Sequence, residues 1–302
     1  MHVFQVLILE DDAYASDIMM MLLARDYRTQ VVAELATPAE LRAFEAEEDL
    51  NGWKGEMRME ELEEERVPRI DVAILDTEMP WDMGLPFRIA ENLSRWANPP
   101  KILCTCTYPN LWAIEKFLKY NNFAGYLVKG EALYSLASAV CLAGRGYCVI
   151  TPEAASQVEK ELGRESFPAK TVMLRSPGMG EIGSGLNQIG REIVRLGLLF
   201  NLPQYDIHDE LAVTENWVAK TMSKGYYSLA IPDLISGEIT LEELFDTPYI
   251  DNRKIVGHYR EILENLPAPA ENREGEVKSP KFKTMSTLAF HLLTRPEIEE
   301  WK

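Results

Sequence analysis

The first half of the chain alternates two kinds of segment in its pattern of apolar and polar positions. Short runs dominated by apolar residues, such as VFQVLIL at residues 3–9, are followed by longer amphipathic stretches, such as residues 13–27. Short runs predict buried strands, and amphipathic stretches predict helices. Strands are expected at 3–9, 29–35, 70–76, 101–106 and 123–129, and helices at 13–27, 37–48, 85–96, 110–120 and 132–144. This alternation predicts an α/β fold with a doubly wound, five-stranded parallel sheet over residues 1–145.

The tract at about 46–68 and the residues after 145 do not follow this strand–helix alternation. An acidic tract at about 46–68 is longer than a crossover needs and is interpreted as an insertion. Residues 146–184 predict one helix and then a linker rich in Gly, Pro and Ser. Three closely spaced helices at 185–232 predict a small all-α domain, and residues 233–302 a helical C-terminal extension of unassigned role.

Composition narrows the function classes. The net charge of −17 argues against a protein that coats nucleic acid or anionic membrane, so any DNA contact must be weak or local. Four cysteines and four histidines show no metal-binding spacing, and no apolar run approaches the length of about 20 residues that a spanning helix needs. We therefore expect a cytoplasmic protein without a membrane segment or a disulfide framework.

Polar side chains follow the predicted strands at their carboxyl ends. Glu10, Asp11 and Asp12 come after the first strand, Asp76 ends the third, Thr105 lies in the fourth and Lys129 ends the fifth. In an open doubly wound sheet, ligands bind at this edge. Carboxylates gathered there repel one another unless a cation neutralises them, and hard oxygen ligands suit Mg²⁺. A lysine and a hydroxyl beside them suit a phosphoryl group, with Asp76 as the nucleophile.

The segments VLILEDD, AILDTEMP, ILCTC and GYLVKG together resemble the receiver domain of bacterial two-component response regulators. The resemblance covers residues 1 to about 145. It implies that Asp76 is phosphorylated by a histidine kinase and that Thr105 and Lys129 bind the phosphate, with Tyr126 as the aromatic switch residue. It also implies that Glu10, Asp11, Asp76 and the main-chain carbonyl of Glu78 hold Mg²⁺. Such a receiver assists only its own phosphorylation and dephosphorylation and is not otherwise an enzyme.

The chain departs from the common receiver pattern in two loops. Trp81 follows Pro80 where the family commonly has glycine, and Gly130 follows Lys129 where aspartate or proline is usual. Both departures alter loop shape near the predicted site.

The stretch DIHDELAVTENWVAKTMSKGYYSLAI predicts a helix, a short turn and a second helix with Thr214 as its N-cap. It resembles the helix-turn-helix of the NarL/LuxR-type regulators, in which the second helix enters the major groove. The resemblance implies transcription regulation, with DNA contacts from Trp217, Lys220, Thr221 and Lys224. Only two of these are basic against four nearby acids, which predicts weak or partner-assisted binding.

Two alternatives remain open from the sequence. A signalling adaptor that uses both domains for protein contacts agrees with the net charge. The family resemblance favours a regulator in which phosphorylation promotes a homodimer or releases the output domain.

The pattern Gly178-x-Gly180-x-x-Gly183 matches a dinucleotide-binding loop, but no predicted strand precedes it, which favours a flexible linker.

Overall fold

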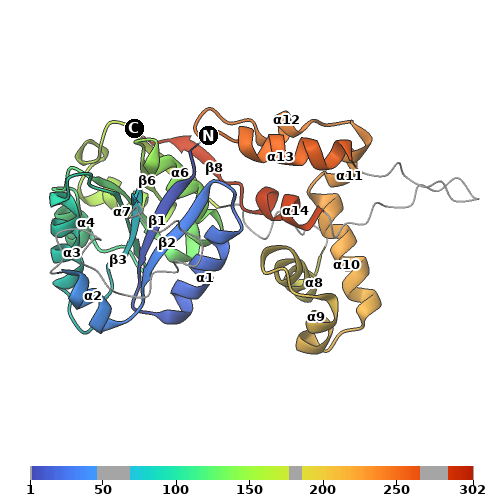
Figure 1. The fold of residues 1–302 in the computed structure, drawn as a ribbon, viewed down its shortest axis with the longest axis horizontal. Helices are drawn as coiled ribbons and strands as arrows, with labels where there is room; N and C mark the ends of the chain where they lie inside the picture. Colours follow the sequence, from blue (N-terminus) through green and yellow to red (C-terminus); the bar gives the residue numbers. More distant parts are fainter. Residues whose placement is uncertain (1, 46–68, 177–185, 266–284, 302) are drawn as a thin grey trace, which may run out of the picture. The chain divides into compact units, whose positions relative to one another are not determined.

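The computed structural model describes residues 2–45, 69–176, 186–265 and 285–301. The chain forms two compact units: Met1–Ser176 together with Pro296–Lys302, and Pro177–Arg295 (Figure 1). The predicted insertion at 46–68 and the glycine pattern at 178–183 lie outside the described residues. Within the described ranges, no helix combines the length and apolar character needed to cross a membrane.

The first unit is built on one eight-stranded sheet in the order β2-β1-β3-β4-β5-β6-β7-β8. The strands are β1 (Phe4–Leu9), β2 (Thr29–Leu35), β3 (Val72–Asp76), β4 (Lys101–Cys106), β5 (Phe123–Val128), β6 (Cys148–Ile150), β7 (Thr171–Arg175) and β8 (Glu297–Glu300). All neighbouring pairs are parallel except β7 and β8. The central strand β3 is buried along its whole length, as continuous apolar runs predict for a parallel sheet.

Helices cover both faces of this sheet, which confirms the doubly wound α/β architecture (Figure 1). The helices are α1 (Ala13–Ala24), α2 (Pro38–Glu45), α3 (Leu85–Arg95), α4 (Leu111–Phe117), α5 (Lys129–Ala132), α6 (Leu136–Gly144) and α7 (Pro152–Glu161). Helices α3, α4 and α7 share one core cluster through Ile89, Ile114 and Val158, whereas α1 and α6 contact each other on the other face.

The sheet has three more strands than predicted, and the first unit continues past the expected boundary at residue 145. Residues 146–184 were expected to hold a helix and a linker, but β6 and β7 flank α7 and extend the sheet. Gly125 allows β6 to approach β5 closely, because a side chain there would overlap the Val149 carbonyl. A three-residue strand such as β6 is too short to give a clear sequence pattern.

The predicted helical extension at 233–302 is wrong at its end, because residues 297–300 form a strand. The segment EIEE has no apolar alternation, yet it pairs antiparallel with β7 as an edge strand. Trp301 follows it, is 4% exposed and lies against Phe167 at a ring distance of 5.4 Å. The guanidinium of Arg164 lies 5.6 Å from the centre of the Trp301 ring and donates a 3.3 Å hydrogen bond to its carbonyl. Aromatic packing therefore anchors this acidic strand.

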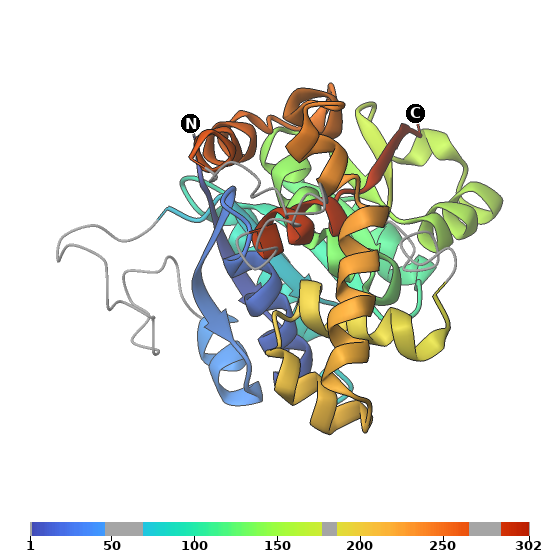
Figure 2. The same cartoon turned by 90° about the vertical axis from the view of Figure 1, so that its right-hand side faces the viewer.

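The second unit is helical. Its helices are α8 (Gln188–Val194), a π-helix (Arg195–Leu199), α9 (Gln204–Leu211), α10 (Glu215–Ser228), α11 (Ile231–Ser236), α12 (Leu241–Phe245), α13 (Arg253–Glu264) and α14 (Ser286–Leu293). Ala212 adopts the left-handed conformation and ends α9, and Thr214 caps α10 as predicted. Helices α8, α9 and α10 lie together (Figure 2). A small cluster of apolar side chains lies between them. This packing gives the predicted helix-turn-helix at α9 and α10.

Candidate functional site

Three carboxylates meet at the carboxyl edge of the sheet in the first unit. Strands β1 and β3 are parallel neighbours with Leu9 opposite Leu75, so the residues that follow them lie side by side. One carboxylate oxygen from each of Glu10, Asp11 and Asp76 lies within 4.8 Å of the others. Glu10 is 1% exposed and Asp76 2%. A divalent cation with oxygen ligands is the group that such a buried cluster fits.

Asp12, the third acid of the opening cluster, has a different role. Its carboxylate accepts hydrogen bonds from the amides of Tyr14 and Ala15, at 2.9 and 3.2 Å. It is the N-cap of α1. Only two of the three adjacent acids therefore belong to the carboxylate cluster.

Lys129 supplies the positive charge of the cluster. It comes directly after β5, and its Nζ lies 2.8 Å from Glu10 Oε2 and 3.3 Å from Asp76 Oδ1. Burial would lower the pKa of Lys129, but the charges of Asp76 and Glu10 outweigh burial and raise it. The lysine therefore stays charged, and it neutralises part of the negative charge of the two carboxylates.

The two buried carboxylates hold protons more tightly than usual. Burial, with a contribution from the charge of Asp76, raises the pKa of Glu10 to about 7 although Lys129 opposes the shift. Burial also raises the pKa of Asp76, against the lowering effects of Lys129 and the Glu78 amide. Both shifts chiefly reflect the cost of burying a charged carboxylate, which a bound cation would reduce.

We expect Glu10 to make the metal-free protein less stable as the pH rises from about 4.5 to about 7. Folded Glu10 keeps its proton up to about pH 7, whereas its ordinary value is 4.5. A raised folded pKa stabilises the fold fully below the unfolded pKa, and this stability is lost as the pH rises through the folded pKa. Urea unfolding across this range measures the loss, and Glu10→Gln should show a smaller one. An equal loss in the variant would contradict the assignment to Glu10.

Thr105 lies beside Asp76 on the neighbouring strand. Thr105 is opposite Asp76 in the β3–β4 register and is 2% exposed. Within the described part of the chain, its hydroxyl has no hydrogen-bond partner. A buried hydroxyl without a partner next to a carboxylate cluster fits a site that binds an additional polar group.

Tyr126 is fully buried, and its hydroxyl lies 3.3 Å from that of Thr77. Thr77 also donates a 3.0 Å hydrogen bond to the Thr105 carbonyl. Sequence reasoning missed Thr77, although it directly follows Asp76. It connects the predicted switch residue to the predicted phosphate ligand.

The side chain of Glu78 contacts the loop after β4. Its carboxylate accepts hydrogen bonds from the amides of Thr107 and Tyr108, at 2.5 and 3.3 Å, while its own amide donates to Asp76 Oδ1 at 3.2 Å. The role of its main-chain carbonyl as a metal ligand, which the family resemblance implies, stays a prediction. The side chain fixes the loop that follows Thr105.

The four predicted DNA-contacting residues of α10 differ in how exposed their side chains are. Lys220 and Lys224 are exposed, Trp217 is half-buried against the apolar cluster of the second unit, and Thr221 is 3% exposed. The prediction that Thr221 faces DNA is wrong in this conformation. It lies three residues after the buried Val218, on the same inner side of the helix.

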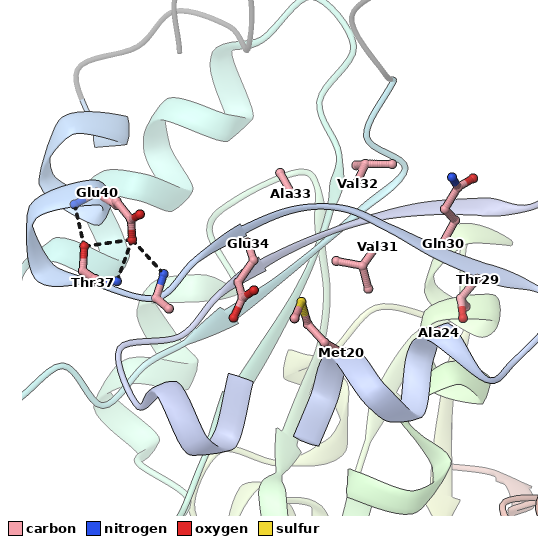
Figure 3. Close-up of a pocket in the computed structure, with 11 residues that line it drawn as sticks. Met20, Ala24, Thr29, Gln30, Val31, Val32, Ala33, Glu34, Thr37 and Glu40 are labelled. Atoms are coloured by element: carbon pink, nitrogen blue, oxygen red, sulfur yellow. Dashed lines mark hydrogen bonds between the residues drawn. The ribbon is translucent and has the colours of Figure 1, made fainter. Parts of the chain in front are cut away.

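A pocket of about 380 Å³ lies elsewhere in the first unit, along the edge strand β2. Met20 of α1 and Glu34 of β2 line it, and the hydrogen-bonded pair of Thr37 and Glu40 lies at one end (Figure 3). None of the three clustered carboxylates lines this pocket. It therefore does not form part of the candidate site.

Comparisons with known proteins gave matches only among solved structures. No protein-family model and no curated protein matches the chain. The response regulator ChrA of a heme-sensing two-component system is 19% identical with a TM-score of 0.37, covering 87% of this chain and all of its own. The RcsB response regulator of Salmonella typhimurium is 16% identical with a TM-score of 0.40, covering 76% of this chain and 93% of its own.

A structure of the RcsB–DNA complex also matches, at 16% identity and a TM-score of 0.37, over 75% of this chain and 92% of its own. The matched structures named here are described as response regulators.

Proposed function

We propose that the chain is a two-component response regulator. In this proposal a histidine kinase phosphorylates Asp76 in the first unit, and the helix-turn-helix of the second unit controls transcription. One observation carries the proposal: a buried aspartate at a strand end lies near two further carboxylates, a lysine 3.3 Å away and a buried hydroxyl that has no hydrogen-bond partner among the described residues. Nucleophile, cation and hydroxyl are the groups that phosphoryl transfer requires.

Asp76 attacks the phosphorus atom of a phosphohistidine or of a small phosphodonor. The bond between its carboxylate oxygen and phosphorus forms as the donor's bond to phosphorus breaks. A leaving imidazole takes up a proton from water, and a leaving carboxylate such as acetate departs as the anion. Asp76 Oδ1 is held by the Glu78 amide and by Lys129, which orients the carboxylate for this attack. Lys129 and the Thr105 hydroxyl bind the phosphoryl oxygens as negative charge accumulates on them.

Glu10, Asp11 and Asp76 are the residues that would hold Mg²⁺, together with the carbonyl of Glu78. When bound, the ion supplies positive charge that neutralises the carboxylates and the incoming phosphoryl oxygens. The carboxylate cluster fits a cation here, because three carboxylates lie close together beside a single described lysine. Burial, with a smaller contribution from the charge of Asp76, raises the pKa of Glu10, and a bound cation would favour its charged form.

Phosphorylation would bias the conformation through the contacts of Thr105. Movement of Thr105 toward a phosphoryl group displaces its carbonyl, which accepts a hydrogen bond from the Thr77 hydroxyl. The Thr77 hydroxyl in turn contacts the Tyr126 hydroxyl. We propose that this shift favours a homodimer of the cytoplasmic protein. The first unit assists only its own phosphorylation and dephosphorylation.

The test is Mg²⁺-dependent phosphorylation of the full chain by acetyl phosphate, followed by intact mass. We expect incorporation in the wild type and none in Asp76→Asn, because the amide lacks the nucleophilic carboxylate. Asp17→Asn is the matched control, since Asp17 is an exposed aspartate of α1 in the same unit. Size-exclusion chromatography of the same samples measures the change in oligomeric state.

Equal incorporation in Asp76→Asn and wild type would place the acceptor elsewhere. No incorporation in any of the three proteins would contradict phosphorylation by small donors and direct attention to protein binding.

The helix-turn-helix and its two exposed lysines support DNA binding as the proposed activity of the second unit. We expect the phosphorylated protein to bind promoter DNA with an affinity that falls as salt increases, because lysines at phosphates release counterions. Replacing Lys220 and Lys224 by alanine should weaken binding and reduce the salt slope by about one for each lysine. Lys160→Ala, at an exposed lysine of the first unit, is the control. A salt slope unchanged in the double variant would exclude these two contacts.

A signalling adaptor is the second candidate function. The exposed acids Asp209 and Glu210 lie on α9, and exposed Glu215 lies on α10, the helix that carries both lysines. Their negative charge opposes a polyanionic partner. Absence of salt-dependent DNA binding by the phosphorylated protein would favour this candidate.

A further inference from the structure

Trp81 connects the loop after β3 to the carboxylate cluster. Its indole N–H donates a hydrogen bond of 2.5 Å to Asp11 Oδ2, across 70 positions of sequence. In the sequence, Trp81 is notable only as a departure from the common receiver pattern near Asp76. The structure gives this residue a direct contact with one of the three clustered carboxylates.

The loop around Trp81 is held firmly. Met79 is 1% exposed, and its carbonyl accepts a 3.0 Å hydrogen bond from the Asp82 amide. Asp82 in turn accepts from the Gly84 amide at 3.1 Å and pairs with Arg88 at 2.8 Å. The indole therefore extends from a loop with fixed ends, so its N–H has a defined position relative to Asp11.

Arg42 of α2 lies over the face of the same indole, with its guanidinium carbon 4.8 Å from the ring centre. A cation over an aromatic face adds attraction to the packing of the ring. The indole is thus held on its face by Arg42 and at its edge by Asp11.

This contact leaves Asp11 with one oxygen for a cation. Oδ2 accepts from the indole, and in the described part of the chain no hydrogen bond reaches Oδ1. A carboxylate held in this way binds a metal through a single oxygen. Mg²⁺ has six close ligands in a near-octahedral arrangement, which single-oxygen carboxylates suit, whereas Ca²⁺ takes six to eight and often binds both oxygens of one carboxylate.

We propose that Trp81 is a positioning residue that makes the site select Mg²⁺ over Ca²⁺ by preventing Asp11 from binding a cation through both oxygens. The inference rests on the proposed function, which places a cation among Glu10, Asp11 and Asp76. Hydrogen-bond partners of metal ligands commonly alter metal affinity by about ten- to a hundredfold.

The test is isothermal titration calorimetry of the unphosphorylated full chain with MgCl₂ and, separately, with CaCl₂. Trp81→Phe keeps an aromatic ring and removes the N–H donor. We expect its ratio of the Ca²⁺ Kd to the Mg²⁺ Kd to fall about tenfold from the wild-type ratio. Trp112→Phe is the matched control, because Trp112 is a 48% exposed tryptophan of α4 in the same unit, and its ratio should equal that of the wild type.

The ratio separates positioning from a structural role. If Trp81 only supports the fold, both affinities fall together and the ratio stays at the wild-type value, which overturns the proposal. Should Trp81→Phe fail to fold, Arg42→Leu decides the question. Arg42 is exposed, and without it the indole loses the cation over its face, so the ratio should fall in the same direction by a smaller factor.

An unchanged ratio in folded Arg42→Leu would then overturn the proposal. A wild-type chain that binds neither cation would overturn both this inference and the proposed metal site. Cation selectivity that depends on Trp81, in a chain whose Asp76 takes no phosphate, would leave this inference standing and overturn only the proposed function.

Discussion

Lys129→Met is expected to reduce phosphoryl incorporation at least about a hundredfold and to lower the free energy of unfolding of the metal-free protein by about 3 kcal/mol. The first effect follows from the loss of a preorganised positive charge where phosphoryl charge develops. The second follows because Glu10 and Asp76 remain buried after their cation is removed. The value is at the lower end of the range for broken buried ion pairs, since the Lys129 side chain is 20% exposed.

Urea unfolding at neutral pH with and without Mg²⁺ measures the stability change. Added Mg²⁺ should restore part of the loss, because the cation and the lysine neutralise the same carboxylates. Lys160→Met is the matched control, since Lys160 contacts Glu161 in an exposed pair at 3.8 Å and its loss should change stability by less than about 0.5 kcal/mol. Equal stability of Lys129→Met and this control would contradict the role of Lys129 in charge compensation.

Trp301→Ala is expected to destabilise the first unit by about 3–5 kcal/mol, the usual range for removing a buried tryptophan side chain. The substitution leaves a cavity beside Phe167 and removes the aromatic partner of Arg164. Without this anchor, the acidic β8 has little apolar surface of its own to hold it on β7. Hydrogen exchange of the β7 amides should therefore become faster.

Exchange measured by peptide mass spectrometry distinguishes β7 from the rest of the sheet. Trp112→Ala, at a half-exposed tryptophan of α4, should leave β7 protection unchanged. Unchanged protection of β7 in Trp301→Ala would mean that strand pairing holds β8 without the aromatic anchor.

The sequence predicted the strand-end residues because parallel strands buried on both faces appear as continuous apolar runs. The polar residue at the end of each run is then visible, which is how Asp76, Thr105 and Lys129 were identified. Parallel register brings these ends together without further information. The placement of the candidate site thus follows from local pattern and one rule of topology.

Contacts between loops could not be predicted in the same way. The hydrogen bond from Trp81 to Asp11 and the side-chain contacts of Glu78 depend on how loops from different strands approach one another. No periodicity encodes that approach. Strand β8 was not predicted for a related reason. It is stabilised by pairing with β7 and by the packing of Trp301, and its own sequence EIEE has no strand pattern.

The burial of Thr221 shows a limit of motif resemblance. The resemblance indicated which helix would face DNA, whereas helical periodicity decides which of its side chains face outward. Val218, Thr221 and Gly225 are all buried and follow one side of α10. The exposed lysines on the remaining surface stay candidates for DNA contact.

The pairing of β7 with β8 sets an order of events during protein synthesis. Both strands belong to the first unit, yet the whole of Pro177–Arg295 is translated between them. As the chain leaves the ribosome, β7 therefore remains an uncovered edge, and Phe167 lacks its tryptophan neighbour, until the second unit has emerged. An uncovered strand edge can pair with other chains, so we expect the newly made protein to be exposed to such pairing at β7 until β8 emerges.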